Sequence, residues 1–375
     1  KTLILFLIKL LTKLIQESWY LIMNNYTTFL KLKSNEIMAF KELEASLKVA
    51  CVPFFDIPKD DQLSEDEFKN KLIKLHKKVT THLKDISNMY LDNFDLDTRF
   101  NIDGNNNYKY ILELFCNIPI IPVVSLDRSI EHIASVINAK TTNVISSKTL
   151  AIRLTYEDFE NFELIEDDFE DMLEDVIDKF EAIDLIFDTR ITTEHNMSTL
   201  PLIILDFVEK ISNKYTLSKI VVTGSSIPSS IADVVSTEES MTITRSELVL
   251  ISKLEEINNL YIGDYTIVSP NYSEVSLPGN VMYNVMTPKT VYSYDNKHYF
   301  IRGGSLKTHP DGSSQFNEQA RVIMSKPFYR GQHYSFGDSF IEEKSRNTGS
   351  SVMPGTILKP TINAHMTYML LDYTD

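Results

Sequence analysis

Cysteine and glycine are scarce in this chain, and their scarcity excludes several classes of protein. The only two cysteines among 375 residues, Cys51 and Cys116, have no CxxC partner, so a zinc knuckle, a redox dithiol and a disulfide-dense secreted fold are unsupported. A reducing cytoplasm suits such a chain, and we expect both thiols to be buried as small hydrophobic side chains. The 11 glycines form no Walker, dinucleotide or GxSxG pattern, which excludes the common nucleotide motifs and a serine hydrolase of the α/β type.

Positive charge is also in deficit. The 37 Lys and Arg residues against 52 Asp and Glu residues give a formal net charge of -15 and a pI of about 5.0. A surface of this sign repels nucleic-acid phosphates and anionic lipid, so we expect neither generic nucleic-acid binding nor membrane association. A locally basic pocket remains compatible with this overall charge.

No apolar run is long enough to cross a bilayer. The apolar segment 1–22 is interrupted by Lys9 and Lys13 and has no small-residue cleavage site. Because Met23 resembles a natural start, we expect residues 1–22 to be an upstream extension or an amphipathic segment outside the fold. Residues 23–375 are expected to form a single domain.

What the chain does contain is a series of short apolar runs, each ending in a charged or hydroxyl residue. Buried parallel strands have this pattern because helices cover both faces of their sheet, and helical segments lie between many of the runs. The runs cover residues 52–56, 120–127, 150–153, 183–188, 220–225, 261–264 and 299–302. Together with a further strand expected from Tyr26 to Leu32, they predict an α/β fold of the closed (β/α) barrel type, similar to a TIM barrel.

Two regions interrupt this alternation. A helix that begins with a capping box of Ser64 and Glu67 is expected to run to about Met89. The polar stretch 92–108 that comes next is rich in Asn and Asp and is expected to be an excursion or a surface loop. A calcium loop is the minor alternative, because the required ligand order and terminal glutamate are absent.

Beyond Pro270 the alternation fails, and we expect a decorated, irregular C-terminal part. Short strands are expected at 281–285, 290–294 and 298–301, then a helix near 316–324 and a final strand at 365–371.

The polar residues that end the runs form the candidate site. In a barrel of parallel strands they converge on the mouth at the carboxyl ends of the strands. The candidate ligand-binding residues are Asp56, Asp127, Arg153, Asp188, Ser225, Asp264 and Arg302, together with Arg245 and Glu247 on the adjoining loop and helix. Clustered carboxylates repel one another, so they require arginines or a bridging cation such as magnesium between them.

Two kinds of function are compatible with such a mouth. The arginines suit an anionic ligand, because a guanidinium binds carboxylate or phosphate in bidentate fashion. Alternatively, a metal-assisted hydrolase or transferase would act there on a phosphate-bearing substrate, with Asp188, Asp264 and His365 as catalytic candidates. A purely architectural role is the third interpretation, since an aspartate such as Asp127 commonly caps the helix that comes after it.

Several phrases, in this order, resemble a known family. They include VPFFDI at 52–57, PVVSLD at 122–127, DLIFD at 184–188, TGSSIP at 223–228, TRSE at 244–247, GDY at 263–265, IRGG at 301–304 and GDSFI at 337–341. The set is similar to the Beta protein family, named after a gene of a satellite phage. Where that family often has two adjacent histidines near its end, this chain has Ala364 before His365. The resemblance implies a protein of prophages and bacterial defence islands that acts in anti-phage defence, with a phage component or a toxic protein as its partner.

Overall fold

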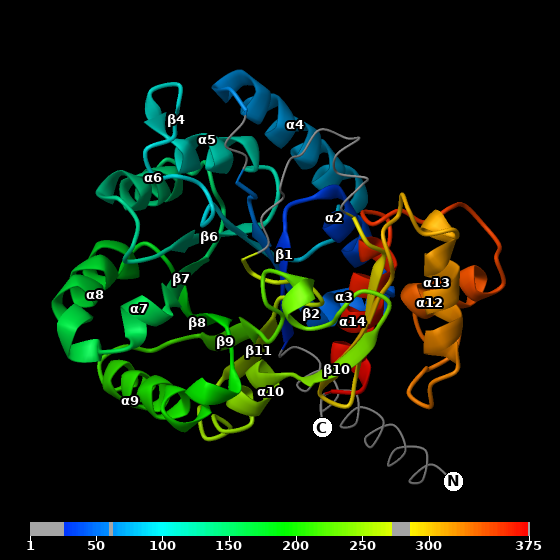
Figure 1. Cartoon of the computed structure of the whole chain (residues 1–375). Helices are drawn as coiled ribbons and strands as arrows, with labels where there is room; N and C mark the ends of the chain where they lie inside the picture. The colour runs from blue at the N-terminus through cyan, green and yellow to red at the C-terminus, as the bar shows by residue number, and fades with distance from the viewer. Residues whose placement is uncertain (1–25, 60–62, 272–285, 374–375) are drawn as a thin grey trace, which may run out of the picture.

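The computed structural model describes residues 26–59, 63–271 and 286–373. Eight parallel strands close into a barrel in the order β1-β11-β9-β8-β7-β6-β3-β2, so the predicted fold is confirmed (Figure 1). The strands are β1 (Tyr26–Lys31), β2 (Cys51–Asp56), β3 (Met89–Asp92), β6 (Ile120–Val124), β7 (Thr149–Thr155), β8 (Ala182–Ile191), β9 (Lys219–Ser225) and β11 (Leu260–Asp264). Most of their residues are buried, as expected of parallel strands covered by helices.

Helices come after most of the strands and surround the barrel. They are α2 (Ser34–Lys41), α3 (Ala45–Ala50), α4 (Glu65–His82), α5 (Asn107–Leu114), α6 (Ile130–Thr141), α7 (Tyr156–Phe159), α8 (Phe162–Ile177), α9 (Leu200–Ser212) and α10 (Ser246–Ile251). The capping box of Ser64 and Glu67 is confirmed at the start of α4. The predicted end of that helix is wrong, because α4 stops at His82 and β3 begins at Met89.

Because of that error, the barrel strand β3 was not predicted. The stretch expected to be a surface loop begins at Asp92, which is the last residue of β3 and is fully buried. The rest of the stretch holds a hairpin of β4 (Asn101–Ile102) and β5 (Asn105–Asn106), and then the start of α5.

Aromatic rings fill the barrel interior. Phe29 stacks on Phe54 with ring centroids 4.4 Å apart, and Tyr90 and Tyr265 extend the same cluster. Gly263 makes room for it, because a Cβ at that position would lie 2.6 Å from the Thr223 Cβ. The core at the middle of the barrel is therefore packed and dry, and polar chemistry is confined to its ends.

The C-terminal part forms a side unit next to the barrel (Figure 1). An antiparallel sheet of β10 (Ser240–Thr244), β13 (Lys297–Arg302) and β12 (Lys289–Tyr294) carries a second hydrophobic core with α12 (Gln315–Met324) and α13 (Phe336–Ser345). The strands and helix expected at 290–294, 298–301 and 316–324 are thus confirmed, whereas 281–285 lies outside the described residues. The run 299–302 belongs to this sheet, so its assignment to the barrel is wrong.

The last element is also different from expectation. Residues 365–371, expected to be a strand, belong to the helix α14 (Leu358–Leu371), which packs on α2, α13 and β12. Almost every side chain of α14 is buried, including the polar Thr361, Asn363, His365 and Thr367, so its sequence has no apolar stripe at helical spacing that would have marked it as a helix. Its contact with α13 is very close, since a Cβ at Gly337 would lie 2.0 Å from the Pro360 carbonyl oxygen.

Two further expectations concern single features. Cys51 is buried as expected, whereas Cys116 is exposed, which corrects the expectation that both thiols are covered. Among the described residues, no helix combines the length and the apolar composition that a bilayer crossing requires. The segment 1–22 lies outside the described residues.

Candidate functional site

Strand alternation decides which strand-end residues face the barrel axis. Residues two positions after an interior ring point inward as well, as Asp56 does after Phe54 and Asp92 does after Tyr90. The inward-facing polar residues at the mouth and those bonded to them form what we call the rim network. Its members are Lys31, Asp56, Asp92, Asp95, Arg128, Arg153, Asp188, Arg190 and Tyr265.

Arg153 is the centre of the rim network. Its Nη1 donates to Asp56 and to Asp92, both at 2.7 Å, and its Nη2 and Nε donate to Asp188 at 2.6 and 3.0 Å. The Tyr265 hydroxyl accepts from Nη2 at 2.8 Å and donates to Asp188 at 2.5 Å. Three carboxylates from three strands are thus held by one fully buried guanidinium.

Cations at the edge of the network complete its charge. Lys31 is buried between Asp56 and Asp95, and Arg190 lies 3.8 Å from Asp188. With Arg128 and Arg153 there are four cations facing the four carboxylates of the network. The network is therefore neutral when every group carries its ordinary charge.

Three of these cations lie close to the ring of Phe94. The guanidinium carbons of Arg153, Arg190 and Arg128 lie 4.3, 4.6 and 5.1 Å from its ring centroid. Arg128 is only weakly paired, because it bonds to Asp92 at 3.3 and 3.5 Å and its Nε has no hydrogen-bond acceptor in the described part of the chain. Arg190 is bonded to the Tyr265 hydroxyl, the Pro270 carbonyl and the Asn271 side chain, so the donor with spare capacity at this part of the mouth is the Arg128 Nε.

The two carboxylates that share the Arg153 Nη1 differ in acidity. Burial acts to raise the pKa of Asp56, but Arg153 and Lys31 hold it well below its usual range. Burial raises the pKa of Asp92, and Arg128 and Arg153 only partly offset this, because Asp56 repels its charge. A proton entering the rim network therefore goes to Asp92.

A strained turn comes after Asp188. Its Oδ1 accepts from the backbone N–H of Arg190, and Arg190 has the left-handed φ of 53° that only some non-glycine residues adopt. The same turn occurs after Asp264, where Thr266 donates to Oδ1 and has a φ of 58°. Both aspartates are thus fixed by backbone geometry as well as by arginines.

Asp264 nevertheless belongs to a different cluster, because it faces outward on β11. We call this cluster the flank network; it lies between the barrel, β12 and α14. Its members are Tyr26, Arg245, Glu247, Asp264, Ser293, His298 and His365. Arg245 is its buried cation, and donates to Asp264 at 2.6 Å and to Glu247 at 2.8 Å.

A directional chain of hydrogen bonds runs through the flank network. Burial acts to raise the pKa of Asp264, but His365 and Arg245 hold it well below its usual range, so it accepts from His365 Nε2 at 2.9 Å. Burial lowers the pKa of His365, so its Nδ1 is bare and accepts from the Ser293 hydroxyl at 2.7 Å. Ser293 in turn accepts from His298 Nδ1 at 3.0 Å. The chain ends at the buried His298 Nε2, which has no hydrogen-bond partner among the described residues.

The comparison with protein families confirms the resemblance found in the sequence. The model of the Beta protein family matches residues 26–371, nearly the whole chain. The chain belongs to the Beta protein family. A search among curated proteins finds no match to it. The chemistry of the two networks is therefore inferred from their own contacts and charges.

Some of the predicted site residues of this Beta-family chain lie together and others do not. Asp56, Arg153 and Asp188 meet in the rim network, whereas Arg245, Glu247, Asp264 and His365 meet in the flank network.

Three predicted residues lie in neither network. Asp127 is exposed and lies 3.6 Å from Arg128, and the helix after it is capped by Ser129. Ser225 bonds to the backbone of Ile227 and Val268, and Arg302 bonds to Thr287 and to the Val235 carbonyl in the side unit.

Sequence reasoning missed several members of the rim network and the ring of Phe94 beside it. They are Lys31, Asp92, Phe94, Asp95, Arg128, Arg190 and Tyr265. Two carried a usable signal, because Lys31 lies two residues after an interior ring of β1 and Tyr265 comes directly after a predicted strand end. Asp92 carried none, since the four residues of β3 are too few to show a pattern.

The rim carboxylates of this Beta-family member do not suit a magnesium ion. Mg²⁺ requires carboxylate oxygens that are free to ligate it in near-octahedral geometry. Here the oxygens of Asp56, Asp92 and Asp188 that face one another are bonded to Arg153, which holds the central place. In the described ranges no three His, Cys, Asp or Glu side chains are grouped so as to hold a metal.

Proposed function

We propose that this Beta-family protein acts in anti-phage defence in the cytoplasm, by binding an anionic ligand, or an anionic group of a phage component or toxic partner, at the barrel mouth. Family membership supports the defence context, and the exposed free thiol of Cys116 supports a reducing compartment. The observation that carries the ligand class is the pair of guanidinium groups, Arg128 and Arg190, beside Phe94.

An anion at this place gains donors without breaking the centre of the rim network. Arg190 is the most exposed of its arginines, at 19%, and Arg128 retains an unbonded Nε. Arg153 keeps its three carboxylates in such a complex. The added negative charge is offset if Asp92 takes up a proton, which is the direction in which burial already moves its pKa.

The experiment is a phosphate titration by calorimetry combined with a plaque assay. The double variant Arg128→Gln/Arg190→Gln is expected to weaken phosphate binding at least about tenfold, since two charge-assisted contacts are lost, and to lose protection against phage. Arg321→Gln, which removes an exposed arginine on α12, is the matched control. A double variant that folds normally, binds phosphate normally and protects as well as wild type would contradict the proposal.

A second candidate function rests on the unequal acidity of Asp56 and Asp92. A carboxyl group whose pKa is raised by burial, beside one whose pKa is lowered by its cations, is the arrangement of a general acid with a base. We propose as the alternative a hydrolase or transferase acting on a phosphate-bearing substrate at the same mouth, with Asp92 as the acid. Asp92→Asn would then abolish turnover of a phosphomonoester such as p-nitrophenyl phosphate while phosphate still binds. Absence of turnover by the wild-type protein, with and without added Mg²⁺, leaves binding as the function.

A further inference from the structure

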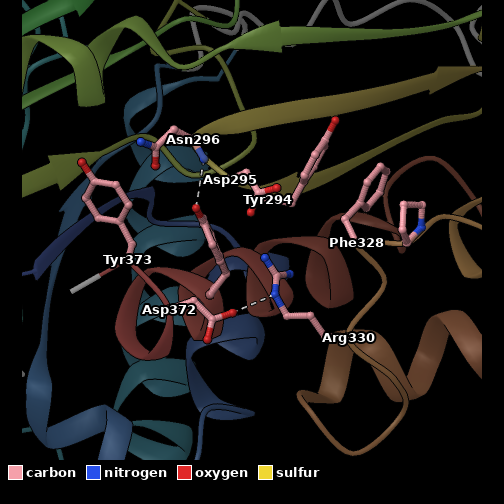
Figure 2. Close-up of a pocket in the computed structure, with 9 residues that line it drawn as sticks. Tyr294, Asp295, Asn296, Phe328, Arg330, Asp372 and Tyr373 are labelled. Atoms are coloured by element: carbon pink, nitrogen blue, oxygen red, sulfur yellow. Dashed lines mark hydrogen bonds and ion pairs between the residues drawn. The ribbon is translucent and has the colours of Figure 1, made fainter. Parts of the chain in front are cut away.

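A cavity lies on the side unit, away from the rim network. It has a volume of about 760 Å³ and opens between the β12–β13 turn, the segment after α12 and the end of α14 (Figure 2). We call it the side pocket. Its lining residues are Tyr294, Asp295, Asn296, Pro327, Phe328, Arg330, Tyr368, Asp372 and Tyr373. Its size is that of a typical ligand site.

A stacked pair of aromatic rings lines one side of the side pocket. The rings of Tyr294 and Phe328 stack with centroids 3.8 Å apart and an interplanar angle of 13°, so nothing fits between them. Both side chains are only half-buried, and Lys297 already lies over Tyr294, 6.0 Å from its centroid. The face of such a ring carries partial negative charge and attracts cations.

The inner end of the pocket contains a cation held in this way. The guanidinium of Arg330 lies 4.4 Å from the Tyr368 ring centroid and 4.9 Å from that of Tyr334. It also donates to Asp372 at 3.0 Å and to the Ser293 carbonyl at 2.9 Å, as the dashed line to Asp372 indicates in Figure 2. The chain's own arginine thus shows which chemistry this pocket stabilises.

The charge of the pocket favours a further cation. The charged lining residues are Asp295, Asp372 and Arg330; Arg330 pairs with Asp372, which leaves the Asp295 charge to be balanced by Lys297 over Tyr294 or by a cation that replaces it. The exposed Asp295 carboxylate makes no hydrogen bond or ion pair with any described residue. It is held at the tip of a fixed turn, because Asn296 donates to the Tyr368 hydroxyl at 3.1 Å and accepts from the Arg245 N–H at 2.9 Å.

We infer that the side pocket binds a cationic side chain, arginine or lysine, on a basic segment of a partner protein. The cation would take the place of Lys297 over the Tyr294 ring and pair with Asp295, repeating the arrangement of Arg330 with Tyr368 and Asp372. The net charge of -15 would speed the encounter with a basic partner. This site takes the charge opposite to that proposed for the barrel mouth, so the two inferences stand independently.

The test is calorimetric titration of the full chain with the capped peptide Gly-Arg-Gly-Arg-Gly. We expect saturable binding that weakens as salt is added, and at least about tenfold weaker binding of the Gly-Gln-Gly-Gln-Gly counterpart. Asp295→Asn removes an exposed charge without touching the packing, and Tyr294→Ala removes the ring. Each is expected to weaken binding by about three- to tenfold. Asp311→Asn, an exposed carboxylate of the side unit outside the pocket, is the control.

Three results would overturn the inference. They are the absence of saturable binding at millimolar peptide, equal affinity for the glutamine peptide, and wild-type affinity of Asp295→Asn. If Tyr294→Ala fails to fold, Asp295→Asn decides alone. A preference for the Gly-Glu-Gly-Glu-Gly peptide would assign the pocket to anions through Arg330 and would equally overturn the inference.

Discussion

The rim network and the flank network use the same residue types at the ends of barrel strands but differ in access. In each, one fully buried arginine binds two or three carboxylates, Arg153 in the rim and Arg245 in the flank. The rim faces the axis and ends in Arg190, which is partly exposed, whereas the flank is covered by α14 and β12. The direction of a strand-end charge, inward or outward, therefore decides whether it lies at an accessible mouth or in a sealed contact between two parts of the molecule.

The largest loss of stability is expected from replacing Arg153 in the rim network. Arg153→Met leaves three buried carboxylates without their shared cation, and removing one partner of a buried ion pair costs about 3–5 kcal/mol. Urea unfolding should show a loss of at least this size, or failure to fold. Adding Asp92→Asn should recover part of the loss, because one of the stranded charges is then neutral. An Arg153→Met protein as stable as wild type would mean that the rim carboxylates are not held as described.

In the flank network the corresponding loss is smaller. His365→Phe removes the Nε2 donor to Asp264 and the acceptor of the Ser293 hydroxyl, but Arg245 and Tyr26 continue to bind Asp264. Unsatisfied buried polar groups cost about 1–3 kcal/mol, and we expect a loss in that range. Ser293→Ala should cost less in the His365→Phe background than in wild type, since only the bond from His298 Nδ1 then remains to be lost. Fully additive losses in the double variant would show that the two residues do not act as one chain.

The two networks also show how far the sequence leads. The barrel could be predicted because each buried parallel strand is a local apolar run, and Asp56, Arg153 and Asp188 could be placed at its mouth because they end such runs. The sequence could also have shown that Asp264 and Asp188 lie in different clusters, since strand alternation puts the two on opposite faces of the barrel wall. Residues an even number of positions from an inward-facing ring on the same strand also face inward, and this rule would have separated the two aspartates.

Other features depend on long-range pairing that no local pattern contains. The run that ends at Arg302 resembles a barrel strand, yet it pairs antiparallel with β10 and β12, as tertiary packing dictates. Helix α14 was mistaken for a strand because it is buried on every side. The position of Phe94 among three arginines results from the pairing of four neighbouring strands, β3, β6, β7 and β8, which end at one mouth of the barrel.

Lowering the pH should destabilise the folded protein through its buried histidines. Burial lowers the pKa of His298 and His365 in the flank, and of His132 near the rim, so the folded protein holds all three neutral. The unfolded chain binds protons below a pKa of about 6.5, so stability is present above that pH and is lost as pH falls, at up to about 1.4 kcal/mol per pH unit for each histidine.

His298→Leu should therefore reduce the slope of unfolding free energy between pH 6.5 and 5 by about a third, since one of three such histidines no longer titrates. His195→Gln, at an exposed position outside both networks, is the control for the loss of a histidine. Chemical unfolding across this pH range measures both. Equal slopes for His298→Leu and wild type would mean that the flank chain is protonated in the folded state.

The smallest effect is expected at Asp127, which the sequence placed at the mouth and the structure leaves on the surface. Its side chain is 41% exposed and lies 3.6 Å from Arg128, so Asp127→Asn should change the unfolding free energy by no more than about 0.5 kcal/mol. Removing this carboxylate also removes a competitor for the Arg128 guanidinium, so phosphate affinity should stay equal or rise slightly, whereas Arg190→Gln lowers it. Calorimetric titration of both variants makes the measurement. Weaker phosphate binding by Asp127→Asn would mean that Asp127 is part of the binding site. The phosphate would then have to be held by a cation or proton next to Asp127 as well as by arginine donors.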